Sequence, residues 1–239
     1  MSELDLTRER LLTAAGQVFA EEGYQGATIR KIKDRAGANI AAVNYYFGDK
    51  ERLYIEAVKF AHGDFMKGMH FPDWGSDTSA TEKLTTFIRA FVTRLMDPDR
   101  PQWYAQLLMK ELASPSAACV EIVQDYIRPV AQKLTAILGE ILPPETPNWK
   151  RFMTGFSIIG QCLYYCQNKP IAVLLVGEEE FKENFTPAAV TKHITDFTLK
   201  ALQREEVVGQ DSKHDVEATC QNGNSDPPAA GNHALNREL

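Results

Sequence analysis

The sequence predicts an all-α protein. Apolar residues recur at helical spacing along most of the chain, and no stretch alternates apolar and polar residues as a half-buried strand would. Glycine, proline and short polar clusters separate the helical stretches. Residues 7–22 form the first helix, with Asp5 or Thr7 as a candidate cap and Gly23 at its end. The residues that share its buried face are Leu11, Leu12, Ala15, Val18 and Phe19.

Three capped helices are expected next. Thr28, Asn39 and Asp49 each precede a helical stretch, and such side chains accept hydrogen bonds from the free amides of a first turn. The helix after Asp49 is the longest and weakens near Gly63 and Gly68, because glycine costs about 1 kcal/mol against alanine inside a helix. The expected inward residues are Ile29, Ile32 and Ala36, then Val43, Tyr46 and Phe47, then Leu53, Ile55, Ala57, Val58 and Phe60.

The second half of the chain contains further helical stretches after a loop at residues 71–79. They are expected at residues 81–96, 102–113, 116–142, 148–168 and 186–204. Pro129 should kink or break one of them, because it lacks an amide N–H and its ring collides with the preceding turn. After Pro170 we expect an acidic loop at residues 178–180. From about Val207 onward there is no aromatic residue, so we expect a disordered tail.

Composition indicates a soluble globular protein, with 44% hydrophobic and 24% charged residues. We find no signal-peptide pattern, and the apolar run at residues 171–176 is far shorter than the roughly 18 residues of a spanning helix. Four cysteines in a chain of 239 residues do not suggest a disulfide framework. These observations favour a cytoplasmic protein without a membrane partner.

Charge is distributed unevenly along the chain. The formal net charge of -6 argues against a protein that coats nucleic acid. Residues 28–35 nevertheless hold four cations and one anion, whereas residues 207–239 hold five acids and two cations. A local DNA footprint at residues 28–35 is compatible with this asymmetry, although a cationic helix face can also be a merely solvated one.

Residues 28–50 contain the parts of a helix-turn-helix DNA reader. A basic helix is followed by a turn at Gly37 and by a second helix that begins at Asn39 with small residues. Two short helices joined by a glycine-containing turn are typical of this motif, in which the second helix enters the major groove.

Residues 10–53 resemble the N-terminal domain of the TetR family of transcriptional regulators. The matching residues are Phe19, Gly23, Tyr24, Ala27, Thr28, Ile29, Arg30, Lys31, Ile32, Ala36, Gly37, Tyr46, Phe47, Lys50 and Leu53. The remaining chain is similar to the CecR-like branch of that family. The residues that suggest this branch are Lys110, Glu111, Ser114, Pro115, Ser116, Arg128, Pro129, Ile159 and Gly160.

The resemblance implies about nine helices and a homodimer. It places a helix-turn-helix domain at residues 1–52 and an effector-binding and dimerisation domain at residues 53–206, before the acidic tail at 207–239. Two positions depart from the family pattern, since Asn44 stands where many members have tyrosine and Lys33 where a small residue is commoner. We therefore do not carry an operator sequence over from the family.

The reader's geometry suggests a role for each exposed side chain. Thr28 and Lys50 lie at helix N-termini, which favour phosphate oxygens. Asn44 can pair with adenine in bidentate fashion, and Arg30 is the candidate for guanine. Asn39 has an alternative role as a helix cap only. The residues expected to contact DNA are Thr28, Arg30, Lys31, Asn39, Ile40, Ala41, Ala42, Asn44, Tyr45 and Lys50.

The larger domain is expected to dimerise and to bind a small-molecule effector. Residues 148–168 and 186–204 are the expected dimer-forming pair, in a four-helix bundle that sets two readers roughly 34 Å apart on an inverted-repeat operator. Aromatic and polar groups on apolar helices suit a ligand pocket, although such a stripe is often core. The candidate effector residues are Trp103, Tyr104, Met109, Phe152, Phe156, Gln161, Tyr164 and Tyr165.

These observations favour a DNA-binding transcriptional regulator, a repressor that a small molecule releases from its operator. The alternative is a small-molecule binding protein whose reader has lost its affinity for DNA. An enzyme is disfavoured because no nucleophile–base pair, phosphate loop, metal set or cofactor motif emerges. Cys162 and Cys166 share a helical face, but we interpret them as buried structural cysteines because no nearby histidine completes a metal site.

Overall fold

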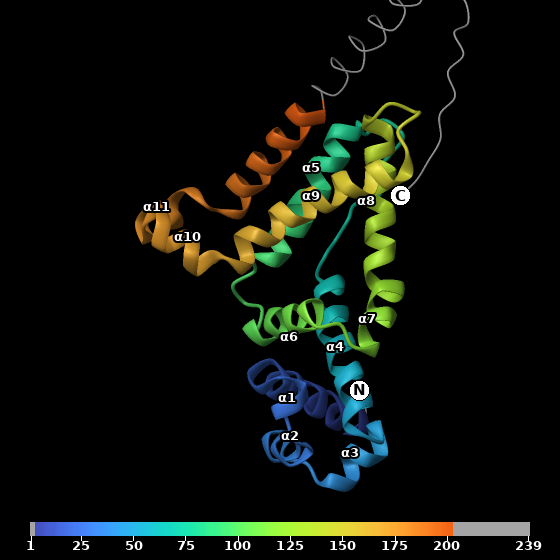
Figure 1. The fold of residues 1–239 in the computed structure, drawn as a ribbon, viewed down its shortest axis with the longest axis vertical. Coiled ribbons are helices and arrows are strands. Elements are labelled where there is room, and N and C mark those ends of the chain that lie inside the picture. The colour runs from blue at the N-terminus through green and yellow to red at the C-terminus, as the bar shows by residue number, and fades with distance from the viewer. Residues whose placement is uncertain (1–2, 203–239) are drawn as a thin grey trace, which may run out of the picture. The chain divides into compact units, whose positions relative to one another are not determined.

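The computed structural model of the chain describes residues 3–202, and within that range it contains helices and no strand (Figure 1). The all-α prediction is confirmed for this part of the chain. The first four helices are α1 (Glu3–Gly26), α2 (Ile29–Ala36), α3 (Ile40–Phe47) and α4 (Lys50–Lys67). Gly23, the expected end of the first helix, has φ 72° and ψ 173°, so the backbone leaves helical geometry there.

The three predicted caps are confirmed. The side chains of Thr28, Asn39 and Asp49 accept hydrogen bonds from amides three residues further on, at 3.3, 2.7 and 2.8 Å. Gly37 ends α2 in the left-handed region at φ 62°, where glycine carries no steric cost. These local bonds place α2 and α3 as a helix-turn-helix, and α4 continues from it.

The core beneath the reader is formed by α1, α4 and one face each of α2 and α3. Its fully buried residues include Leu11, Phe19, Ile32, Val43 and Leu53. Ile29, Ala36 and Tyr46, which we expected to face inward, are only partly buried. The Tyr46 hydroxyl donates a hydrogen bond to the Leu4 carbonyl at 3.1 Å, so this ring lies at the edge of the core.

The larger region begins after an irregular segment at residues 69–79, which contains the predicted loop at residues 71–79. Its first elements are α5 (Ala80–Leu95), α6 (Gln102–Ala113), α7 (Ala117–Ile122), the π-helical turn η1 (Val123–Ile127), α8 (Arg128–Ile141) and α9 (Asn148–Gln167). The predicted break near Pro129 takes the form of η1, where the Arg128 amide donates to the Val123 carbonyl five residues before it. A wider turn accommodates the missing proline amide without ending the helix.

Two helices occupy a stretch that we expected to be irregular. They are α10 (Lys169–Val176) and α11 (Glu178–Asn184), and a last described helix covers residues 187–202. The prediction of an acidic loop at residues 178–180 is wrong, because these glutamates form the first turn of α11, where the helix dipole favours acids. The expected number of about nine helices is too small for the same reason, since α1 to α11 already lie within residues 3–184.

The predicted boundary after residue 52 falls inside α4, which runs unbroken from Lys50 to Lys67. Residues 3–199 belong to one compact unit. The predicted tail at residues 207–239 lies outside the described residues. None of the helices described is long and apolar enough to cross a membrane.

Candidate nucleic-acid interface and internal cavity

The start of α3 presents an exposed, nearly uncharged face. Asn39, Ile40, Ala41, Asn44 and Tyr45 are all exposed. The exposed fraction of Tyr45 is 77%. Ala42 is half-buried, and the opposite side of the helix is buried through Val43 and Phe47. The residues predicted to contact bases therefore share the accessible side of α3. Asn39 uses its Oδ1 for the cap, so the cap role is observed and the DNA contact stays a prediction.

The four cations of α2 differ in how strongly they are paired. Lys31 Nζ lies 2.8 and 2.9 Å from the two carboxylate oxygens of Glu22 on α1. Arg35 makes a bidentate pair with Glu21 at 2.7 and 2.8 Å, and their hydrogen bond lowers the pKa of Glu21 and raises that of Arg35. Sequence reasoning missed these pairs, although the two glutamates directly precede Gly23.

The Arg30 side chain remains the most available cation on α2. It is 88% exposed, and within residues 3–202 its one ion pair is a loose 4.0 Å contact from Nε to Asp34, which also pairs with Lys33. Lys50 lies at the first turn of α4, with its ammonium 4.6 Å from the centre of the Tyr24 ring. Thr28 is exposed at the first turn of α2. Thr28 and Lys50 thus lie at helix N-termini, where a phosphate oxygen is favoured, and the phosphate contacts of all three residues stay predictions.

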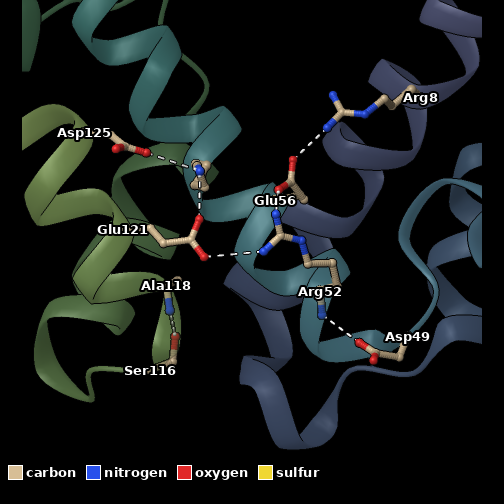
Figure 2. Close-up of polar contacts among 9 residues, drawn as sticks. Arg8, Asp49, Arg52, Glu56, Ser116, Ala118, Glu121 and Asp125 are labelled. Carbon is tan, nitrogen blue, oxygen red and sulfur yellow. Dashed lines mark hydrogen bonds and ion pairs between the residues drawn. The ribbon is translucent and has the colours of Figure 1, made fainter.

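Ion pairs connect the reader to the larger region (Figure 2). Glu56 on α4 accepts from Arg8 of α1 at 2.7 Å and from Arg52 at 2.9 Å. Glu121 on α7 lies 3.4 Å from Arg52, and it lies 2.8 Å from Lys59. Asp125 on η1 also contacts Lys59, at 3.3 Å. We call these six residues the interhelix ion-pair chain; it runs from α1 through α4 to α7 and η1.

A buried hydrogen-bond network makes a second connection. The Tyr54 hydroxyl on α4 donates to Glu111 on α6 at 2.7 Å, and the Ser116 amide and hydroxyl donate to the same carboxylate at 2.8 and 2.9 Å. Burial, followed by the hydrogen bond with Glu111, raises the pKa of Tyr54. The Tyr54 ring packs edge-on against Phe19 and Tyr24, so the Glu111 carboxylate is linked directly to the core beneath the reader.

A partly open cavity of about 320 Å³ is lined by residues of α4, α5, α6, α7, η1, α8 and α9. This volume is within the range of ligand sites, roughly 300–1,000 Å³. Its surface is almost wholly apolar and includes Phe65, Phe87, Phe91, Leu134, Phe152 and Ile159. The polar groups at the wall include His62, Arg100, Glu111, Tyr126, Thr135 and Gln167.

Three of the predicted effector residues, Met109, Phe152 and Phe156, line this cavity. The cavity lining does not include Trp103, Tyr104, Gln161, Tyr164 or Tyr165. Trp103 instead packs against α1, where a Cβ added to Gly16 would lie 2.0 Å from its ring. The aromatic pattern misses this distinction because α6 and α9 each carry aromatic residues on more than one face.

Arg100 and His62 are two of the polar cavity residues that sequence reasoning missed. The Arg100 Cζ lies 4.7 Å from the centre of the Phe65 ring and 5.4 Å from that of Tyr104. Its Nε is buried without a hydrogen-bond partner in the described residues. Arg100 follows a Pro98–Asp99 turn, and in sequence it is indistinguishable from a solvated loop charge.

His62 is 6% exposed, and neither of its ring nitrogens has a hydrogen-bond partner among residues 3–202. Burial, followed by repulsion from Arg100, lowers the pKa of His62 to about 4. The imidazole is therefore neutral at neutral pH, with one N–H donor and one acceptor nitrogen.

Of the two cysteines on α9, Cys162 is buried as predicted, whereas Cys166 is only half-buried. Burial raises the pKa of Cys162 to about 12 and also raises that of Cys166, whose Sγ donates to the Leu95 carbonyl at 3.1 Å. A raised pKa disfavours the thiolate that metal binding and oxidation require. No group of three or more potential metal ligands occurs among the residues described.

Comparisons with known proteins match both regions of the chain. Residues 11–57 match the bacterial regulatory proteins of the tetR family, and residues 80–202 match the C-terminal domain of the HTH-type transcriptional dual regulator CecR. The CecR protein of Shigella flexneri is 27% identical over 210 residues, which cover 82% of this chain and 93% of that protein. The HTH-type transcriptional repressor NicS of Pseudomonas putida is 38% identical over 63 residues, 26% of this chain and 30% of its own length.

Solved structures agree in fold. A bacterial regulatory protein in the tetR family from Rhodococcus RHA1 has a TM-score of 0.62 at 19% identity, covering 84% of this chain and 98% of that chain. The hemolysin II transcriptional regulator HlyIIR has a TM-score of 0.52 at 21% identity, covering 81% and 99%. At these identities the likeness concerns the fold alone.

Proposed function

Because the chain belongs to the TetR family of bacterial transcriptional regulators, in its CecR-like branch, we propose that it represses transcription until a small molecule fills its cavity. It is a DNA-binding transcriptional regulator. The observation that supports DNA reading is the exposed start of α3. Three helix caps hold it above a packed core. A rigid, accessible helix start is what base reading in a major groove requires.

The proposed DNA contacts divide into positioning and reading. Thr28, Lys50 and Tyr45 bind phosphates, and Arg30 contacts either a phosphate or a guanine edge. Lys31 also binds a phosphate once its ion pair with Glu22 is broken. Base reading is proposed for the exposed face of α3, where alanines let the backbone approach the groove closely. The residues proposed for this role are Asn39, Ile40, Ala41, Ala42 and Asn44.

We propose a homodimer built on α9 and the helix at residues 187–202. Trp149, Met153, Phe156 and Tyr164 form an exposed stripe on one face of α9, and Phe156 alone is 67% exposed. Phe197 on the last helix is also exposed. Apolar stripes of this kind mark interfaces, and a two-fold axis there suits a four-helix bundle and an inverted-repeat operator.

Met153→Asp tests this interface. We expect it to produce a monomer in sedimentation velocity and to lower operator affinity, because a buried carboxylate would face its own symmetry mate. Gln132→Asp, at an exposed position on α8, is the matched control and should remain dimeric. A dimer that survives Met153→Asp would contradict the proposed interface.

The α7–η1 segment is proposed to couple the cavity to the reader. Ile122 and Tyr126 line the cavity, whereas Glu121 and Asp125 hold α4 through the interhelix ion-pair chain. A ligand that displaces this segment changes the position of α4 and thereby the reader's geometry. Lowering DNA affinity 100-fold requires the ligand to favour the non-binding geometry by about 2.7 kcal/mol.

Binding of the full-length protein to its own upstream DNA tests the regulator directly. Fluorescence anisotropy at two salt concentrations should show tight binding that weakens steeply with salt, because phosphate contacts release counterions. Absent or salt-independent binding would refute the proposal and favour a binding protein that has lost its affinity for DNA. Asn44→Ala should relax base preference at one step of the site, and unchanged selectivity would remove Asn44 from the reading residues.

A further inference from the structure

The cavity lining contains one half-buried cation, Arg100, that forms no ion pair within the described residues. The nearby carboxylates are occupied, since Asp64 and Asp97 both pair with Arg94, at 2.6 and 2.8 Å. Arg100 forms no ion pair with any residue in the described range, and it contacts the Phe65 and Tyr104 rings instead. Burial, followed by repulsion from Arg94, lowers the pKa of Arg100. An arginine in this setting is an unsatisfied site for an anion.

A second polar group at the same wall also has no partner. His62 lines the cavity and is repelled electrostatically by Arg100, so the two side chains act on the same region. Neither His62 nitrogen is hydrogen-bonded within residues 3–202, although the ring is almost fully buried. Such orphaned groups are uncommon in folded proteins and point to a missing ligand.

The other charged group at the wall, Glu111, does not compete for this role. Its carboxylate already accepts hydrogen bonds from Tyr54 and Ser116, so its charge is satisfied by the protein itself. The cavity lining therefore combines a large apolar surface with one cation that forms no ion pair within the described residues. That combination selects a molecule with an apolar body and one negative head.

We propose that the effector is an amphipathic carboxylate, whose head binds Arg100 and accepts a hydrogen bond from His62 while its apolar body fills the aromatic part of the cavity. This inference rests on the proposed effector role of the cavity and names the ligand class. A carboxylate head uses the fork of donors on arginine, and the neutral His62 supplies one further N–H.

A charge series of ligands on the wild-type protein tests the inference without any variant. Decanoate, decanol and decylammonium have the same chain and differ in head charge. Binding to the full-length protein is measured by calorimetry without DNA and below the micelle concentration. We expect decanoate to bind at least about tenfold more tightly than decanol, and decylammonium more weakly still. Equal affinity for decanoate and decanol, or no binding by decanoate, would overturn the inference.

Variants at Arg100 and His62 then test whether these residues cause the preference for decanoate over decanol. Arg100→Leu should reduce the ratio of decanoate to decanol affinity to about one, whereas Arg100→Lys should keep part of it. His62→Phe, which retains a ring, should weaken decanoate about tenfold and decanol little. Arg89→Leu replaces an exposed arginine on α5 and should leave the ratio unchanged. An Arg100→Leu protein that keeps the wild-type ratio would overturn the assignment.

DNA binding is measured separately, so the two proposals fail separately. Wild-type protein that binds its upstream DNA but shows no head-charge preference supports the regulator and contradicts the carboxylate. Protein that prefers decanoate but never binds DNA supports the ligand class and contradicts the regulator.

Discussion

Arg30 and Arg100 show how the same side chain serves two different regions of this molecule. Arg30 lies on α2, is 88% exposed and, among the residues that the structure describes, pairs only loosely with Asp34. Arg100 lies at the cavity wall between aromatic rings, with its Nε buried and unpaired in the described structure. An exposed cation interacts weakly with any one partner and is screened by salt, whereas a desolvated cation interacts strongly with few.

The different exposure of Arg30 and Arg100 suggests that the two regions obtain their selectivity in different ways. We propose that the reader binds DNA through many weak, salt-sensitive contacts, while helix caps hold the exposed, uncharged face of α3. In the cavity, by contrast, we propose that a single cation in an apolar lining decides which ligand binds. We therefore expect changes at the reader to alter affinity with little effect on stability, and changes near the cavity to alter stability strongly.

The largest expected effect is on the buried network that joins the two regions. Glu111→Ala leaves the Tyr54 hydroxyl and the Ser116 amide without their acceptor, so the free energy of unfolding should fall by about 3 kcal/mol. Urea denaturation measures this change. Glu111→Gln keeps an acceptor oxygen and should cost less, and Glu145→Ala controls for the loss of an exposed acid. If Glu111→Ala lowered the free energy of unfolding no more than Glu145→Ala, the buried network would not stabilise the junction of the two regions.

Next comes the pH dependence contributed by His62. Its pKa is near 6.5 in the unfolded chain and about 4 in the folded one, so between these values only the unfolded state binds the proton. Stability is therefore retained above pH 6.5 and lost as the pH falls toward 4, by about 3 kcal/mol from this group. In His62→Leu this part of the slope should disappear, whereas His70→Gln should keep it. Urea titrations at several pH values measure the slope, and an identical slope in His62→Leu would contradict the assignment.

A smaller effect is expected at the reader. Lys50→Ala should weaken DNA binding about tenfold on every sequence and reduce the slope of log affinity against log salt by about 1, because one phosphate contact is lost. Its urea midpoint should stay near that of wild type. Lys182→Ala removes an exposed cation on α11 and should change neither quantity. If Lys50→Ala altered selectivity but not the salt slope, Lys50 would be a reading residue.

The smallest expected change is a gain of affinity. Glu22→Gln releases Lys31 and removes an acid close to the DNA-facing surface, so affinity should rise by roughly two- to fivefold and the salt slope should steepen. Anisotropy titrations at several salt concentrations resolve this. Glu145→Gln is the matched control far along the chain. Unchanged affinity in Glu22→Gln would mean that Lys31 takes no part in binding.

Sequence reasoning was most successful where the determining interactions are local. Thr28, Asn39 and Asp49 cap helices through bonds to amides three residues ahead, which requires no knowledge of the rest of the fold. It failed at residues 178–180, where acids that look like loop residues stabilise the first turn of α11. It also did not find the ion pairs of Lys31 and Arg35, because their partners Glu22 and Glu21 belong to a different helix.

The sequence by itself determined the reader, because caps, turn glycine and apolar spacing act over a few residues and are visible along the chain. Only the tertiary structure decided which residues line the cavity. Arg100 and His62 are separated by 38 positions in sequence, and their meeting at one apolar wall depends on how α4, α5, α6 and α9 pack. Burial and the lack of a counter-ion are properties of that packing, so the charge that we propose selects the ligand has no signature in the sequence alone.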